Sequence, residues 1–138
     1  YKFQGQVTSG VCSIAQRAAL AAIQGKSNSR KLMVEAFKRR RDLACNLLKE
    51  IKGMKLRVPQ GAFYIMPDIS YFFGKSDSVV KVNNSDDMAL YILDKAQVAV
   101  VAGDAFGAPG CIRISYATSD ELLVEAVKRI KSSLEKLK

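Results

Sequence analysis

Histidine is absent from the 138 residues of this sequence. Without an imidazole, neither a Ser-His-Asp nor a Cys-His catalytic arrangement can form, and most zinc and iron sites are excluded as well. The three cysteines are isolated and odd in number, which argues against a disulfide scaffold and favours a reducing compartment. Any chemistry must therefore use lysine, arginine, tyrosine, carboxylates or a cofactor, and no metal site is predicted.

Long apolar runs are also missing. No stretch approaches the roughly 20 apolar residues of a membrane-spanning helix, and the first residues do not resemble a signal or transit peptide. We therefore expect no association with a membrane. The sequence does not begin with methionine, which leads us to expect a piece of a longer protein. Hydrophobic residues make up 49% of the chain and predict one domain with a packed core.

The net charge of +9 is concentrated in one segment. Eleven lysines and arginines lie between Lys26 and Arg57, against three acids, and residues 38–41 are all basic. Such a patch is typical either of nucleic-acid binding or of the solvated face of a helix. Apolar residues keep helical spacing throughout the segment, so we favour the helix face and do not expect nucleic acid as a partner.

Hydrophobic periodicity predicts helices over residues 8–25, 30–51 and 85–96, and from residue 118 onward. Alternation predicts short strands over residues 55–58, 62–66, 98–101 and 111–116. Thr118 and Glu121 form a capping-box pattern at the start of the last helix. The predicted fold is an α/β (α+β) sandwich, in which helices cover a small sheet of short strands.

Arg113 is the most informative single residue. Its neighbours Ile112 and Ile114 are apolar, so strand alternation places Arg113 on the opposite face. An arginine there indicates either a structural ion pair or edge position, or a clamp for a planar carboxylate, and spacing alone leaves both open. The preceding loop contains Gly103, Gly107 and Gly110 and would let the backbone approach a ligand, but it lacks the lysine and spacing of a phosphate-binding loop.

Three motifs occur in order along the chain: Pro59-x-Gly61-Ala62-Phe63-Tyr64, Val98-Ala99-Val100-Val101-x-Gly103-x-x-Phe106-Gly107 and Ile112-Arg113-Ile114-Ser115-Tyr116-Ala117. Together they resemble the C-terminal third of class I (fold type I) aminotransferases, which depend on pyridoxal phosphate (PLP). The sequences of these motifs are most similar to those of prokaryotic-type aspartate aminotransferases, including plant plastid enzymes that also transaminate prephenate. The segment 4–16 is similar to the family segment that follows the cofactor lysine, so the resemblance covers essentially the whole chain.

This resemblance implies specific roles. Arg113 matches the arginine that binds the substrate's α-carboxylate, while Gly61 and Phe63 match a strand-turn that closes over the substrate. Thr8 and Ser9 match a segment near the dimer interface of a homodimer, where cofactor contacts occur. Residues 1–29 would then be the trailing segment of the large cofactor-binding domain and the helix leading out of it, and residues 30–138 the small domain. A plant source would imply the chloroplast stroma, and any other source the cytoplasm.

The sequence departs from the family in one decisive respect. The lysine that forms the Schiff base with PLP, in a Ser-Lys motif before a Gly-Trp-Arg turn, has no match here, so no catalytic residue is predicted within this chain. Lys95 is the least hydrophilic lysine in context, but helix-end lysines are usually solvated. Two alternatives remain: a non-catalytic module that binds nucleic acid or an acidic partner, and a truncated form that pairs with intact subunits.

Overall fold

The computed structural model describes residues 2–8, 10–25 and 28–138. The chain divides into two compact units, Tyr1–Leu32 and Met33–Lys138. The first unit contains α1 (Lys2–Thr8), α2 (Ser13–Gln24) and the beginning of α3 (Ser29–Lys49). The single helix predicted over residues 8–25 is therefore wrong at its start, since residues 10–12 are not helical and α2 begins at Ser13. Gly10, with the high backbone freedom of glycine, lies at this interruption.

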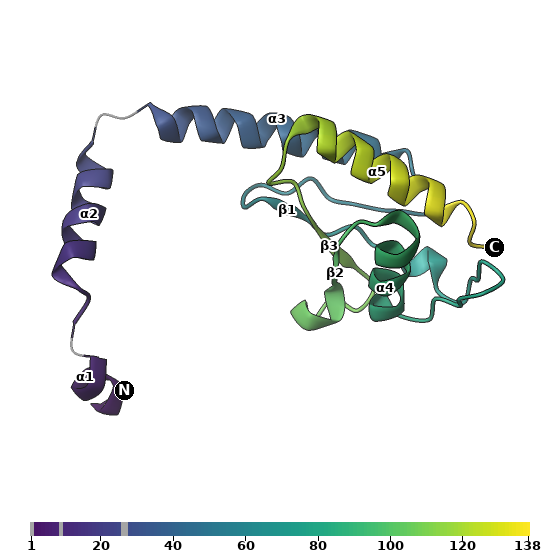
Figure 1. The fold of residues 1–138 in the computed structure, drawn as a ribbon, viewed down its shortest axis with the longest axis horizontal. Coiled ribbons are helices and arrows are strands. Elements are labelled where there is room, and N and C mark those ends of the chain that lie inside the picture. The colour runs from purple at the N-terminus through teal and green to yellow at the C-terminus, as the bar shows by residue number, and fades with distance from the viewer. Residues whose placement is uncertain (1, 9, 26–27) are drawn as a thin grey trace. The chain divides into compact units, whose positions relative to one another are not determined.

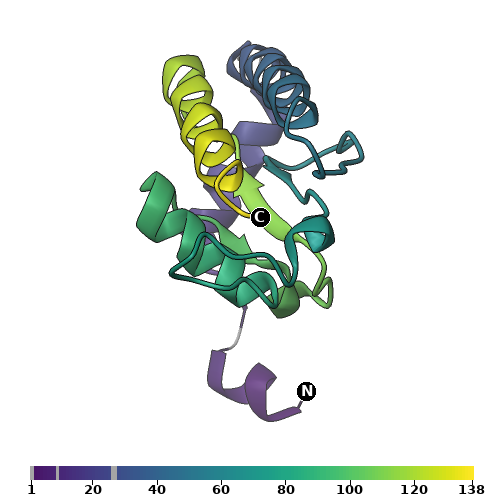
Figure 2. The ribbon, with the colours of Figure 1, turned by 90° about the vertical axis from the view of Figure 1, so that its right-hand side faces the viewer.

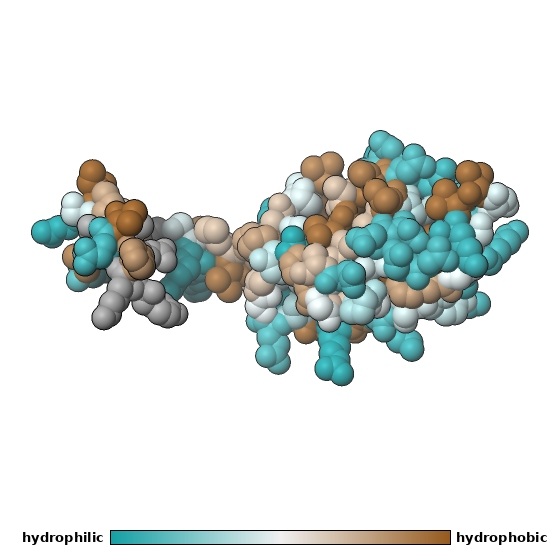
Figure 3. All heavy atoms as spheres, turned by 90° about the horizontal axis from the view of Figure 1, so that it is seen from below, coloured by the Kyte–Doolittle hydropathy of each residue, from teal (hydrophilic) through white to brown (hydrophobic). Residues whose placement is uncertain are grey.

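Helix α2 ends as predicted at Gly25, whose amide donates to the Ala21 carbonyl oxygen at 2.8 Å. None of its side chains is buried, and Ile14 and Ile23 are 78% and 83% exposed. Figure 3 shows apolar side chains at the surface of this unit. The described residues of the unit therefore supply no core for the apolar residues of α2.

The second unit holds the sheet and the core. It contains most of α3, followed by β1 (Tyr64–Ile65), the 3-10 helix η1 (Ser70–Phe72), α4 (Ser85–Ala96), β2 (Val101–Ala102), the 3-10 helix η2 (Gly103–Phe106), β3 (Ile112–Ser115) and α5 (Asp120–Leu134). The three strands are antiparallel in the order β1-β3-β2. Helices α3 and α5 lie side by side (Figure 1), and α4 packs against α5, where the buried Tyr91 hydroxyl donates to the Ser133 carbonyl oxygen at 2.9 Å. The predicted fold class, a small sheet covered by helices, is confirmed.

Three ion pairs link α3 and the residue that follows it to α5. Arg39 and Arg40, in the middle of α3, contact Asp120 at the start of α5 at 2.9 and 3.2 Å, and Glu50, just after α3, contacts Lys131 in the last turn of α5 at 3.5 Å. Figure 2 shows the two helices adjacent from a second direction. None of the described helices is both long and apolar enough to cross a membrane.

The core lies between the sheet and the three helices of this unit. The predicted inward positions of α4, of α5 and of the three residues that follow α5 are all buried: Met88, Tyr91, Ile92, Leu123, Val127, Ile130, Leu134 and Leu137. Helix α3 contributes Ala44, Cys45 and Leu48, while its predicted inward residue Val34 is 62% exposed. Burial of Cys45 raises the pKa of its thiol, so this cysteine behaves as a core residue.

Three local predictions are wrong. Residues 55–58 form no strand, because only Lys55 makes a bridge, to Asp68, and no partner strand continues it. The strand predicted over 98–101 is displaced to Val101–Ala102, since the pairing begins where Val101 lies opposite Arg113. The cap of α5 is Ser119, not Thr118, because the Ser119 hydroxyl accepts from the Leu122 amide at 3.3 Å.

Candidate functional site

Arg113 lies on the central strand of the sheet. Its Cα is paired with that of Val101 on β2, while Ser115 of the same strand is paired with Tyr64 on β1. Ile112 and Ile114 are buried in the core, and Arg113 is half-buried on the opposite face, as strand alternation predicts. The edge position considered for this arginine is therefore wrong.

Two aromatic rings flank the Arg113 guanidinium. Its central carbon lies 4.9 Å from the centroid of Tyr64 and 4.4 Å from that of Phe106, within the range of cation–π contacts. Among the described residues, Arg113 forms no ion pair with any carboxylate. The rings satisfy the faces of the guanidinium but not its N–H groups, which remain suited to a planar anion.

The glycine-containing loop places Phe106 beside Arg113. The Gly103 amide donates to the Cys111 carbonyl oxygen at 2.9 Å, and the Ala108 amide donates to the Gly103 carbonyl oxygen at 3.0 Å. A side chain on Gly103 would overlap the carbonyl oxygens of Ala108 and Cys111. Gly103 is therefore required by the chain's own backbone, which explains this glycine without the ligand approach suggested by the sequence.

The turn before β1 is fixed by Tyr116. The Tyr116 hydroxyl donates to the Ala62 carbonyl oxygen at 2.9 Å, and its amide donates to the Phe63 carbonyl oxygen at 2.9 Å. Ala62 has a φ of 59°, a conformation that these two hydrogen bonds stabilise. Burial raises the pKa of the Tyr116 phenol, so it remains a protonated donor at neutral pH.

A cleft of about 490 Å³ lies between this turn and α3. Its lining residues are Val34, Phe37, Lys38, Arg41, Gln60, Gly61, Ala62, Phe63 and Tyr116. The Phe63 ring is 43% exposed and lies 6.3 Å from the Phe37 ring and 4.4 Å from the Tyr64 ring, measured between centroids. Three of the nine lining residues, Phe37, Phe63 and Tyr116, are aromatic, and the cleft is open to solvent.

The structure brings some of the predicted site residues together. Gly61 and Phe63 line the same cleft, and Tyr64 connects them to Arg113, because its ring contacts both Phe63 and the guanidinium. Thr8 is described only as the last residue of α1, and Ser9 lies outside the described residues. The predicted cofactor contacts of these two residues therefore stay predictions.

Phe106 is the site residue that the sequence did not indicate. Residues 61–64, Tyr64 included, are predicted from the sequence to form part of the closing wall, but the contact of the Tyr64 ring with Arg113 was not predicted. The position of Phe106 depends on how the 103–110 loop closes, and no local pattern encodes that closure.

The described residues do not fit the attachment site of PLP. A Schiff-base lysine needs a desolvated setting that lowers its pKa, whereas every described lysine side chain is exposed or half-exposed. Lys95 contacts Asp94 at 3.0 Å, and this hydrogen-bonded pair raises the pKa of the lysine. No group of three or more His, Cys, Asp or Glu side chains within the described part of the chain could hold a metal ion.

The basic run on α3 is largely engaged in ion pairs. Arg39 and Arg40 both contact Asp120, at 2.9 and 3.2 Å, and Arg41 contacts Asp42 at 2.7 Å. Arg41 also donates to the Pro59 carbonyl oxygen at 3.4 Å. The three consecutive arginines therefore already have partners within the chain. This disfavours the interpretation of the basic run as a nucleic-acid site.

Comparison with known proteins identifies clear relatives. The family model described as aminotransferase class I and II matches residues 1–130. The bifunctional aspartate aminotransferase and glutamate/aspartate-prephenate aminotransferase of Petunia hybrida is 47% identical over 141 residues, which cover 99% of this chain and 29% of the relative. The aspartate/prephenate aminotransferase of Cereibacter sphaeroides is 47% identical over 130 residues, 94% of this chain and 32% of the relative.

Solved structures give the same result. The crystal structure of the Rhizobium meliloti aspartate aminotransferase matches with a TM-score of 0.89 and 42% identity, over 99% of this chain and 34% of that one. The Thermus thermophilus aspartate aminotransferase with maleate matches with a TM-score of 0.78 and 36% identity, over 96% of this chain and 32% of that one. The chain thus spans about a third of the length of these relatives, and the resemblance seen in its motifs is confirmed.

Proposed function

This chain belongs to the aminotransferase class I and II family, and we propose that it is the C-terminal part of an enzyme that transfers amino groups between amino acids and 2-oxo acids. The observation that carries the proposal is Arg113, flanked by the Tyr64 and Phe106 rings and without a carboxylate partner among the described residues. Such a guanidinium is preorganised for a carboxylate, which every amino acid and 2-oxo acid carries.

In this proposal Arg113 binds the α-carboxylate of the substrate. The planar fork of arginine forms two parallel hydrogen bonds with a carboxylate, which fixes the orientation of the bound acid as well as its position. Contacts with Tyr64 and Phe106 restrict the guanidinium before binding, so less side-chain entropy is lost when the substrate arrives. Several relatives are named for aspartate and prephenate, and one is described with maleate, all of them dicarboxylates. We therefore propose dicarboxylic substrates of the aspartate, glutamate and prephenate type.

Gly61 and Phe63 form part of the wall that closes over the substrate. The Phe63 ring is partly exposed and packs against Tyr64, the ring that contacts Arg113. Movement of the small domain would carry this apolar ring over the substrate and exclude water from it. The hydrogen bonds from Tyr116 to the Ala62 and Phe63 carbonyl oxygens hold the turn against the rest of the domain, so the turn would move with the domain as one piece.

Residues outside this chain would carry out the cofactor chemistry. PLP, on which the family depends, would be held mainly by a larger domain that carries the Schiff-base lysine, so the chain alone would be inactive. Residues 1–29 would be the end of that domain and the helix leading out of it, and residues 30–138 the small domain. A homodimer, and the chloroplast for a plant source, follow from the same family resemblance.

The test is the effect of Arg113→Ala on transamination by the full-length protein. We expect kcat/KM for aspartate and 2-oxoglutarate to fall by an amount equivalent to about 2–5 kcal/mol, as for other truncated charge pairs at an interface. Arg57→Ala is the matched control, because Arg57 is exposed and lies outside the site. An unchanged kcat/KM in Arg113→Ala would refute the assigned role, whereas the absence of transamination in the unmodified protein would refute the proposed function.

A further inference from the structure

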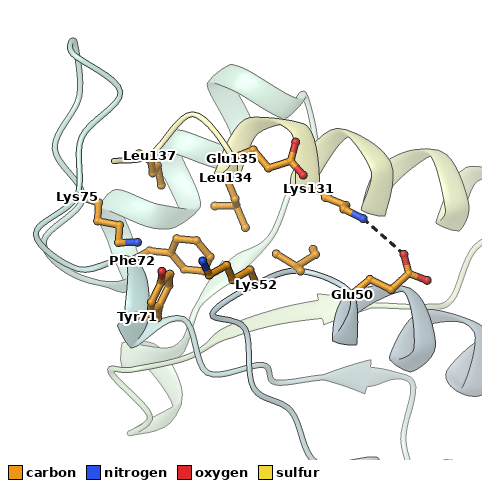
Figure 4. Close-up of a pocket in the computed structure, with 10 residues that line it drawn as sticks. Glu50, Lys52, Tyr71, Phe72, Lys75, Lys131, Leu134, Glu135 and Leu137 are labelled. Atoms are coloured by element: carbon orange, nitrogen blue, oxygen red, sulfur yellow. Dashed lines mark ion pairs between the residues drawn. The ribbon is translucent and has the colours of Figure 1, made fainter.

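A second pocket lies where the C-terminal ends of α3 and α5 meet η1, and it shares no residue with the Arg113 site. Its volume is about 300 Å³, and it is lined by Glu50, Ile51, Lys52, Tyr71, Phe72, Lys75, Lys131, Leu134, Glu135 and Leu137 (Figure 4). The floor is apolar, because the side chains of Ile51, Phe72, Leu134 and Leu137 all belong to the buried core. The remaining lining residues are charged or, in Tyr71, phenolic.

Tyr71 is held in place by a glycine on one side and a lysine on the other. Gly53 has a φ of +90°, and a side chain at this position would overlap the Tyr71 ring, so the ring packs directly on the backbone. The Lys75 ammonium lies 3.6 Å from the Tyr71 ring centroid and 5.7 Å from that of Phe72. The aromatic wall of the pocket and the lysine beside it are therefore fixed by specific contacts.

Two cations converge at the Tyr71 end of the pocket. Figure 4 shows the ammonium groups of Lys52 and Lys75 both directed toward Tyr71. The pKa of the Tyr71 phenol is lowered chiefly by its hydrogen bond with Lys75, with a smaller contribution in the same direction from the charge of Lys52. Neither lysine forms an ion pair with a carboxylate of the described residues.

The opposite end of the pocket differs in charge. Lys131 is paired with Glu50 at 3.5 Å, and Glu135 is exposed on the same side. The lysine at this end is thus compensated, while the two at the Tyr71 end are not. The pocket combines an apolar floor with a localised positive charge at one end, an arrangement that matches a ligand with an apolar body and one anionic group.

We propose that this pocket binds a small organic acid, with its carboxylate between the ammonium groups of Lys52 and Lys75 and its apolar body on Phe72 and Leu134. The carboxylate would gain charge-assisted hydrogen bonds from both lysines, and the body would cover the exposed edge of the apolar floor. A volume of about 300 Å³ is at the small end of ligand pockets and matches a compact molecule. An inorganic anion would use the lysines but gain nothing from the floor.

The experiment is calorimetric titration of the full-length protein with 3-phenylpropanoate, in an Arg113→Ala background that removes the proposed substrate clamp. We expect saturable binding that Lys52→Gln and Lys75→Gln each weaken about tenfold, the factor for one lost charge-assisted hydrogen bond. Lys49→Gln should leave the affinity unchanged, because Lys49 is exposed on the last turn of α3 and does not line the pocket. The uncharged 3-phenylpropanamide should bind much more weakly than the acid.

Three results would overturn the inference: no saturable binding, binding that is insensitive to both lysine substitutions, or inorganic phosphate that competes as strongly as the organic acid. The last result would show that the apolar floor contributes nothing. Because the titration is done without the Arg113 side chain and measures no transamination, its failure would leave the proposed function intact. Conversely, loss of the proposed function would leave this pocket and its test unchanged.

Discussion

The guanidinium carbon of Arg113 lies 4.4 Å from the ring centroid of Phe106, across the loop that separates η2 from β3. The contact depends on Gly103, where the loop's backbone passes too closely for a side chain. Through its contact with Arg113, Phe106 has a positioning role. The ring restricts the movement of the guanidinium and leaves the guanidinium N–H groups free for an anion.

We expect Phe106→Leu in the full-length enzyme to raise KM for the amino-acid substrate roughly two- to fivefold, the size of one exposed cation–π contact. The value of kcat should change less, because a leucine side chain at this position would weaken the positioning of Arg113 without removing it. Phe106→Tyr, which keeps the aromatic ring, should restore the original KM. Steady-state kinetics of the three proteins provide the measurement, and an unchanged KM in Phe106→Leu would show that the ring does not position Arg113.

The face occupied by Arg113 was predictable, but its surroundings were not. Alternation needs only the two flanking isoleucines, so the orientation of Arg113 followed from local sequence. The approach of Tyr64 depends on strand pairing, and that of Phe106 on the closure of a loop. Both are tertiary features with no local signature.

The secondary structure also contains elements that local sequence predicts correctly and elements that depend on tertiary contacts. Helix α4 has the predicted bounds, 85–96, because its apolar spacing coincides with acidic residues in the first turn and with the Asn84 cap, whose side chain accepts from the Asp87 amide. Leu56 and Val58 alternate with charged residues as a strand would, yet no neighbouring strand pairs with them. Alternation indicates a strand only where the fold supplies a partner.

Asp120 gives a prediction for pH dependence. The Arg39 hydrogen bond, assisted by Arg40, lowers the pKa of Asp120 in the folded protein. The stabilisation is therefore complete above the unfolded-state pKa of this carboxyl and is lost as the pH falls through its lower folded-state value. We expect Asp120→Asn to reduce Tm slightly at neutral pH, as is typical of solvent-accessible ion pairs, and the difference from the unmodified protein to vanish in acid.

The measurement is thermal unfolding of both proteins over a series of pH values. Glu35→Gln is the control, because Glu35 is an exposed carboxylate on α3 outside the ion pairs of the described residues. A difference in Tm that persists unchanged into acid would contradict the assignment to the ionised carboxylate.

Leu48 tests the packing of α3 on the core. Its side chain is 0% exposed, so Leu48→Ala should lower the free energy of unfolding by about 2–5 kcal/mol, through lost burial and the cavity left behind. Leu90→Ala is the control, since Leu90 on α4 is 65% exposed and its truncation should change stability little. Denaturant unfolding measures both, and equal effects would show that α3 does not pack as described.

Gly53 and Gly74 separate two reasons why a glycine is needed. Both have similar positive φ values, +90° and +85°, but only at Gly53 would a side chain meet a neighbour, the Tyr71 ring. Gly74→Ala should therefore cost only the conformational strain, about 1–3 kcal/mol in free energy of unfolding. Gly53→Ala should cost more, because it also displaces the ring. In a Tyr71→Ala background the ring is absent, so the two glycine substitutions should become equally costly by denaturant unfolding. If Gly53→Ala stayed more costly there, the excess would arise from something other than the ring, and Tyr71 would not be positioned by direct packing on the backbone at Gly53.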